Sequence, residues 1–193
     1  AINQSNIKRL MAYSSIGHVG YALIGLAVGG NFGIQATLIY MSIYIIMNLG
    51  TFACILSMKR GDQMLEGISD LKGLSKSQPF LALVLTIFMF SMAGIPPLAG
   101  FFGKLYIFLA AIKSEFYYLA ILGAITSVIA AFYYLRIIKL MYFDEPQDDL
   151  DKINSRPISI VLSISAILLV LFIVYPTPLV DSATIATTAL FNE

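Results

Sequence analysis

The stretch that decides the fold is PFLALVLTIFMFSMAGIPPLAGFFGKLYIFLAAI, Pro79–Ile112, which is apolar except for one charged residue, Lys104. A hydrocarbon core about 30 Å thick is crossed by about 20 helical residues, so this stretch is too long for one upright helix. A double proline interrupts it, and proline neither donates a backbone hydrogen bond nor continues a preceding helix. The sequence therefore predicts a broken transmembrane helix over Phe80–Ile112.

The predicted break is built from residues that restrict or free the backbone: Gly94, Pro96, Pro97, Gly100 and Gly103. Non-helical backbone persists at membrane depth only where protein or a water-filled cavity covers it. Lys104 follows the break at about 12 Å from the end of the stretch, which is near the midplane. An ionisable side chain at that depth is costly and is a functional candidate.

The composition extends this prediction to the whole chain. Of its residues 59% are hydrophobic and 12% charged, with a mean hydropathy of +0.85, whereas soluble domains carry about 25% charged residues. We expect an all-α, polytopic transmembrane bundle with spans at 10–29, 34–58, 80–112 (broken), 116–135 and 157–175. The fourth span is expected to continue as an interfacial helix to Phe143. The chain opens without an initiator Met, and we expect it to be a piece of a longer protein.

The placement of charge predicts the orientation. Ten of the 12 Lys and Arg residues fall on one side: Lys8, Arg9, Lys59, Arg60, Lys72, Lys76, Arg136, Lys139, Lys152 and Arg156. By the positive-inside rule, the N-terminal end and the loops at 59–79 and 144–156 are cytoplasmic, and five spans then place Asp181–Glu193 outside.

Other chemistries find no support in the sequence. The acidic segment 144–156 lacks the spacing of a calcium loop and is interpreted as a solvated loop. Cys54 is the only cysteine, so no internal disulfide forms. No nucleotide, iron–sulfur or zinc motif occurs, and no nucleic-acid partner is expected.

Polar residues from different spans share one depth. Lys104, His18, Asn48, Thr126 and Ser127 all lie about 12–16 Å from an end of their spans. Helical stripes add further polar side chains, and the supporting set comprises Ser14, Tyr44, Asn48, Thr126 and Ser127. Such stripes face the bundle, where they serve either as ordinary packing contacts or as part of a polar path.

Two residues carry a sharper hypothesis. His18 either relays protons, because a neutral imidazole both donates and accepts, or is a hydrogen-bonded core histidine. Lys104 has no carboxylate at membrane depth within this chain, and a lysine that is easily neutralised suits a proton carrier. The alternative is a lysine hydrogen-bonded to the open carbonyls of its own helix break.

Four segments resemble the antiporter-like membrane subunits of respiratory complex I, most closely the subunit N (NADH dehydrogenase subunit 2) family. They are NIKRLMAYSSIGHVGY (6–21), DLKGLSKSQP (70–79), AGIPPLAGFFGKLYIF (93–108) and FYYLRIIKLMYF (132–143). The sister subunit M carries glutamate where Lys104 stands. Multisubunit Mrp-type sodium/proton antiporters also carry GFxGK and remain the alternative, and a purely scaffolding role is a third possibility.

The resemblance implies the second half of an inverted-repeat fold, in which Lys104 is the lysine of the broken twelfth helix and His18 the histidine of the tenth. It implies a proton-translocating subunit of NADH:quinone oxidoreductase that couples quinone reduction to proton transport. No cofactor is expected in this chain, since NADH, FMN, iron–sulfur clusters and quinone belong to the rest of the complex. The implied partners are the other membrane subunits and the lipid of the bacterial inner membrane.

Overall fold

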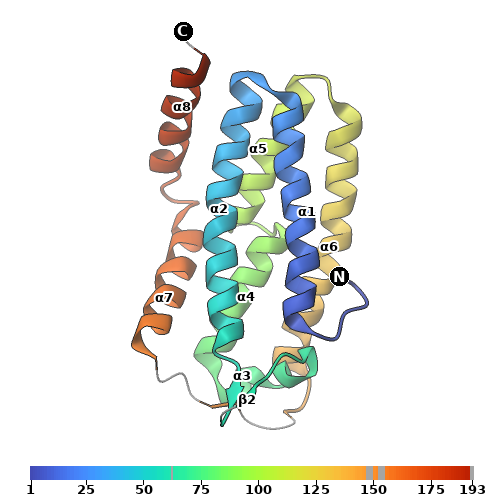
Figure 1. Ribbon diagram of the computed structural model, residues 1–193, viewed down its shortest axis with the longest axis vertical. Coiled ribbons are helices and arrows are strands. Elements are labelled where there is room, and N and C mark those ends of the chain that lie inside the picture. Colours follow the sequence, from blue (N-terminus) through green and yellow to red (C-terminus); the bar gives the residue numbers. More distant parts are fainter. Residues whose placement is uncertain (62, 147–149, 152–154, 192–193) are drawn as a thin grey trace.

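A computed structural model describes residues 1–61, 63–146, 150–151 and 155–191, and its long helices run side by side along one axis (Figure 1). The main helices are α1 (Ile7–Val28), α2 (Gly30–Leu56), α4 (Pro79–Ala93), α5 (Ala99–Lys113), α6 (Tyr117–Phe143), α7 (Arg156–Leu171) and α8 (Thr177–Phe191). By length and composition, α1, α2 and α6 are able to cross a membrane. The predicted all-α bundle is confirmed.

The predicted helix break is also present. α4 and α5 follow one another along the same line, and the connection between them lies at mid-height in the bundle (Figure 1). Pro96 and Pro97 occupy this connection, joined by a cis peptide bond. Each half-helix has 15 residues, about 22 Å at 1.5 Å per residue, so neither half alone matches the hydrocarbon thickness.

α2 is the central helix of the bundle. It packs against α1, α4, α5, α7 and α8, and it contributes fully buried side chains such as Tyr40, Ile43 and Met47 to the core. Gly50 lets α2 approach α4, because a Cβ at this position would overlap the ring of Phe88. The long apolar run of α2 therefore reflects burial on several sides rather than contact with lipid all round.

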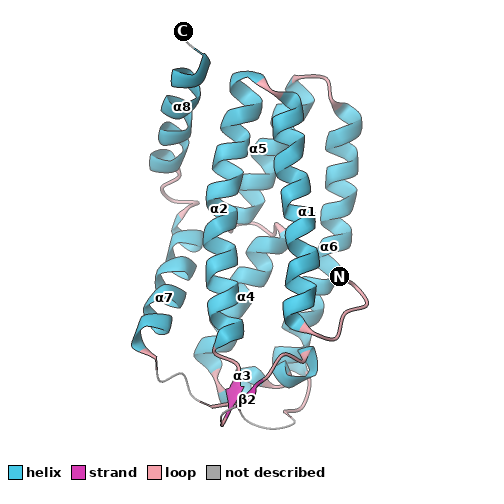
Figure 2. Ribbon diagram, in the orientation of Figure 1, coloured by secondary structure: helices cyan, strands magenta, loops and turns pink. Residues whose placement is uncertain are grey.

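The cation-rich end of the bundle is closed by short elements (Figure 2). They are β1 (Lys59–Arg60) paired antiparallel with β2 (Gln63–Met64), then a 3₁₀ turn at Ile68–Leu71 and α3 (Leu74–Ser77). The sequence predicted only a polar loop at 59–79, and the hairpin escapes prediction because two-residue strands have no periodicity. Of the acidic loop, residues 147–149 and 152–154 lie outside the described residues.

The N-terminal end of α1 is tied to this closing layer. The Asn6 side chain caps α1 by accepting a hydrogen bond from the Arg9 N–H at 3.0 Å, so the helix begins at Ile7, before the expected start. Asn6 Nδ2 and Lys8 Nζ also donate to the two carboxylate oxygens of Glu66, at 2.8 and 2.7 Å. The loop is therefore fixed to the end of the first helix.

The last segment differs from its prediction. The helix expected over 157–175 ends at Leu171, and a further helix, α8, begins at Thr177 and lies beside α2 (Figure 1). Gln35 Nε2 donates to Thr184 Oγ1 at 2.7 Å across this contact. Asp181, which the sequence assigned to the exterior, is an exposed residue of α8. Pro176 and Pro178 divide the segment, and the Thr- and Ala-rich composition of α8 keeps its hydropathy low.

Candidate functional site

The site is built on the end of α4. Gly94 adopts φ +81°, a conformation that favours glycine, and its N–H bonds to the carbonyls of Phe90 and Ser91. The Ser91 hydroxyl accepts a hydrogen bond from the Gly100 N–H at 3.0 Å and donates to Met47 Sδ at 3.0 Å. These contacts fix the end of α4 to the start of α5 and to α2.

Lys104 lies one turn into α5, and its side chain turns back to the end of α4. Its Nζ donates to the carbonyls of Met92 at 2.9 Å and Ala93 at 3.2 Å, and to Ser127 Oγ of α6 at 2.9 Å. The residue is only 4% exposed. The ammonium therefore meets the free carbonyls at a helix C-terminus, where partial negative charge favours a cation.

Lys104 has no acidic partner in the part of the chain that the structure describes, where the ion pairs join other cations to Glu66, Glu145 and Asp144. The face of the Tyr21 ring lies near it instead, with Nζ 5.1 Å from the ring centroid. The hydrogen bonds to Met92 and Ala93 are the ones expected if Lys104 binds the open carbonyls of its own helix break, which was the alternative to a proton carrier. Ser127 adds a partner from another helix that neither hypothesis named for this lysine.

His18 is held between two tyrosine hydroxyls. Its Nδ1 lies 2.7 Å from the hydroxyl of Tyr40 on α2, and its Nε2 lies 3.0 Å from the hydroxyl of Tyr134 on α6. The Tyr134 hydroxyl also contacts Ser14 Oγ. The Tyr44 ring stacks on the imidazole at a centroid distance of 4.7 Å. His18 thus joins α1, α2 and α6, and both of its nitrogens have partners.

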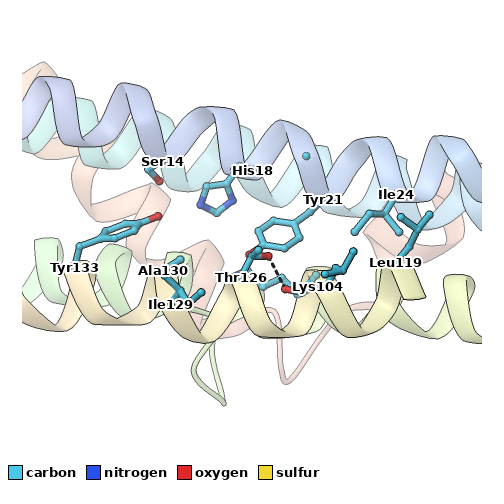
Figure 3. Close-up of a pocket in the computed structure, with 14 residues that line it drawn as sticks. Ser14, His18, Tyr21, Ile24, Lys104, Leu119, Thr126, Ile129, Ala130 and Tyr133 are labelled. Carbon is cyan, nitrogen blue, oxygen red and sulfur yellow. Dashed lines mark hydrogen bonds between the residues drawn. The ribbon is translucent and has the colours of Figure 1, made fainter. Parts of the chain in front are cut away.

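A groove between α1 and α6 connects the two clusters (Figure 3). Its volume is about 340 Å³, and both His18 and Lys104 line it. Tyr21 and Thr126 lie between them, with their hydroxyl oxygens 3.3 Å apart. The surface of the groove is mainly apolar, and its polar members are Ser14, His18, Tyr21, Lys104, Thr126 and Tyr133. Of the five residues that the sequence placed at one depth, His18, Lys104 and Thr126 thus line one groove.

Asn48 is the predicted residue that stays apart. It does not line the groove, and its Oδ1 is buried without a hydrogen-bond partner among the residues described. The sequence-based predictions missed the roles of Tyr40, Tyr134 and Ser91. Tyr40 and Tyr134 lie on the same helical stripes as the predicted polar residues, so the spacing contained the signal, but phenol rings are also ordinary core side chains.

In the described ranges, no group of three or more His, Cys, Asp or Glu side chains is placed to hold a metal ion. Cys54 is a free, buried thiol of α2. The chemistry of the site therefore rests on one amine, one imidazole and a set of hydroxyl groups.

An ionisable side chain buried inside a helical membrane bundle is typical of proteins that move ions or protons. The chain is a member of the NADH:quinone oxidoreductase/Mrp antiporter transmembrane family, whose model matches residues 1–130. It is a multi-pass membrane protein, as this family and its apolar helices show.

Known proteins of this family align along nearly the whole chain. NADH-quinone oxidoreductase subunit N of Paramagnetospirillum magneticum is 55% identical over 191 residues, 99% of this chain and 39% of that relative. Respiratory complex I from Thermus thermophilus is similar at TM-score 0.80 and 29% identity, over 93% of this chain and 40% of that one. An archaeal membrane-bound sulfane sulfur reductase gives TM-score 0.84 and 32% identity, over 96% of this chain and 38% of that one. The chain spans about two fifths of the length of these relatives.

Proposed function

We propose that this chain forms part of a proton path in the membrane arm of an NADH:quinone oxidoreductase, with Lys104 as the proton-carrying group. The observation that carries the proposal is the position of Lys104 Nζ, which is buried on free carbonyls, lacks a carboxylate partner among the described residues and borders a groove shared with His18. The 55% identity to a subunit N supports the choice of complex.

The geometry gives Lys104 two opposing influences on its charge. Burial in an apolar bundle disfavours the ammonium, since transfer out of water removes its solvation. The carbonyls of Met92 and Ala93 favour the ammonium, because they are acceptors at the negative end of a helix dipole. A group balanced between these influences gains or loses a proton in response to modest changes nearby, as a carrier requires.

The same relatives and the distribution of cations support a wider assignment. In this proposal the chain lies in the bacterial inner membrane with its N-terminal end cytoplasmic and its C-terminus outside. Its partners are neighbouring membrane subunits of the complex, and lipid covers the remaining apolar surface. NADH, FMN, iron–sulfur clusters and quinone are handled by other parts of the complex, so this chain contributes proton transfer rather than redox chemistry.

The test replaces the lysine within the intact complex. Lys104→Gln removes the titratable amine but keeps a polar side chain, and it is expected to lower the number of protons pumped per NADH oxidised in inverted membrane vesicles. Lys113→Gln is the matched control, because Lys113 ends the same helix and its Nζ lies over the Phe32 ring at 4.7 Å, away from the break. Normal pumping by the assembled Lys104→Gln complex would rule out the carrier role.

A second candidate is a subunit of an Mrp-type sodium/proton antiporter, because the matching family model covers both kinds of protein. Deletion of the gene separates them. Loss of NADH:quinone activity from the membranes supports the first assignment, whereas intact NADH oxidation with lost sodium tolerance supports the second. The scaffolding role predicts that Lys104→Met is neutral or mildly stabilising, because it removes a desolvated charge.

A further inference from the structure

Tyr21 is the residue of α1 that contacts the amine of Lys104. The Nζ of Lys104 lies over the Tyr21 ring, 5.1 Å from its centroid, and both residues line the groove between α1 and α6 (Figure 3). The hydrogen bonds of Lys104 go to α4 and α6. The contact from α1 is therefore a π face and not a hydrogen bond.

The hydrogen bonds of Lys104 leave the ring a separate role. A lysine ammonium has three N–H donors, and three acceptors are in reach: the carbonyls of Met92 and Ala93 and the hydroxyl of Ser127. The Tyr21 ring therefore does not compete for an N–H. It acts on the charge itself, because the negative face of an aromatic ring attracts a cation and has little attraction for a neutral amine. The ring thus favours one protonation state of Lys104 over the other.

The ring of Tyr21 is held in its place by three other helices. It packs at steep angles against the rings of Tyr40 on α2 and Phe108 on α5, at centroid distances of 6.0 and 6.1 Å. Its hydroxyl lies 3.3 Å from Thr126 Oγ1 on α6, and Thr126 donates its own hydrogen to a backbone carbonyl, so Tyr21 is the donor. Packing therefore fixes the face that the ring turns to Lys104.

Few other side chains near Lys104 ionise. The helices that pack against α5 contain no Asp or Glu, and α4 and α7 bury no ionisable side chain. Apart from Cys54 in the last turn of α2, the buried ionisable side chains of α1, α2 and α6 are His18, Tyr21, Tyr40, Tyr44, Tyr133 and Tyr134. Both nitrogens of His18 are bonded to other tyrosines than Tyr21. The amine of Lys104 is therefore the cation on which the Tyr21 ring acts.

We propose that Tyr21 is a positioning residue that stabilises the protonated form of Lys104 through the face of its ring, an inference that rests on the proposed function. The ammonium is attracted to the ring, and the attraction is lost when the amine gives up its proton. Together with the carbonyls of Met92 and Ala93, the ring sets the pH up to which Lys104 takes up a proton.

The experiment changes the charge distribution of the ring and keeps nearly its size. In the intact complex in inverted membrane vesicles, position 21 carries either phenylalanine (Tyr21→Phe) or 3,4,5-trifluorophenylalanine, whose fluorines withdraw electron density from the ring face. We expect Tyr21→Phe to pump protons over the same pH range as the unchanged complex, because the ring remains. With the trifluorinated ring, the alkaline limit of pumping per NADH should move to lower pH by about half to one unit.

Phe32 provides the matched control. Its ring lies 4.7 Å from Nζ of Lys113 at the end of the same helix, and the residue is 58% exposed. Lys113 is far from the helix break, so the same trifluorinated residue at position 32 should leave the pH profile of pumping unchanged.

The outcomes separate this inference from the function beneath it. Identical pH profiles for the two rings at position 21, with lost pumping by Lys104→Gln, overturn the role of Tyr21 and leave the proton path intact. Normal pumping by Lys104→Gln overturns both proposals. An equal shift from the trifluorinated ring at position 32 also overturns the inference, because the effect then does not arise at Lys104. If the trifluorinated complex does not assemble, a monofluorinated ring at position 21 decides the question, and a profile identical to that of Tyr21→Phe overturns the inference.

Discussion

Gly94 and Lys104 lie on opposite sides of the helix break, and the side chain of Lys104 fills the space that a side chain at Gly94 would need. A Cβ at Gly94 would lie 3.1 Å from Cδ and 3.3 Å from Nζ of Lys104, and Gly94 has φ +81°. The lysine side chain therefore passes over a position of the break where the main chain carries no side-chain atoms.

We predict that Gly94→Ala destabilises the protein and displaces Lys104. The left-handed conformation costs an alanine about 1–2 kcal/mol, and the added methyl pushes against the aliphatic part of the lysine. Thermal unfolding of the purified complex, read together with pumping, measures both effects. Gly61→Ala is a suitable control, because Gly61 has φ +59° with no atom within 4 Å of the added Cβ. An equal loss of pumping in both variants would contradict the predicted steric effect on Lys104.

Gly50→Ala is expected to destabilise the packing of α2 on α4 by about 1–3 kcal/mol, as overpacking of a filled core does. The added methyl overlaps the Phe88 ring, which is fully buried. Phe88→Leu should therefore recover part of the stability lost in Gly50→Ala. A double-mutant cycle of melting temperatures tests this relation. Strict additivity of the two changes would show that the two residues do not constrain one another.

Two tyrosines of α2 contact His18 in different ways, Tyr40 through its hydroxyl and Tyr44 through its ring. Tyr40→Phe leaves Nδ1 of His18 without its partner in a buried site, and we expect a loss of about 1–3 kcal/mol. Tyr44→Phe keeps the ring that stacks on the imidazole and removes a hydroxyl for which the described part of the chain shows no partner. We therefore expect Tyr44→Phe to be close to neutral. Equal melting temperatures for the two variants would show that the Tyr40 hydroxyl does not stabilise the fold.

The closing loop should respond to acid through Glu66. Hydrogen bonds from Lys8 and Asn6 hold the pKa of Glu66 below its usual value of 4.5. Because the carboxylate is favoured in the folded state, its contribution is fully present above the unfolded pKa and is lost as the pH falls through the folded one. We expect the Ile7 amide, which donates to the Glu66 carbonyl, to exchange its hydrogen faster relative to neighbouring amides below about pH 4.5. Glu66→Gln should abolish this pH dependence.

The sequence was sufficient to predict the broken helix and its lysine, since two prolines and a charge within an apolar stretch are incompatible with one continuous helix in lipid. It also placed Lys104, His18, Thr126 and Ser127 at one depth by counting residues along each helix. In the structure the first three line one groove, and Ser127 accepts a hydrogen bond from Lys104. Partners were harder to predict. The carbonyls of Met92 and Ala93 are available only because a helix ends there, and their distance from Nζ depends on how α5 turns back on α4.

Two other features show that the depth and hydropathy of residues do not by themselves predict which residues and helices pack together. Asn48 shares the depth of the site but lies outside the groove, because helix rotation and neighbouring side chains decide which residues meet. α8 was missed because threonine and alanine lower its hydropathy, although its buried residues Ala183 and Thr187 are four apart and face one side. Packing against α2, rather than composition, identifies it as part of the bundle.

The two prolines of the break have a consequence beyond ending α4. From Gly94 to Leu98, the N–H groups of Gly94 and Ile95 bond to carbonyls of α4, and that of Leu98 bonds to Ile95. The two exposed residues between them, Pro96 and Pro97, have no N–H to satisfy. The chain therefore leaves the helix at mid-height with carbonyl acceptors in excess and every donor in this segment either bonded or absent. Such an excess of hydrogen-bond acceptors favours a side chain that only donates hydrogen bonds, and the ammonium of a lysine is such a group.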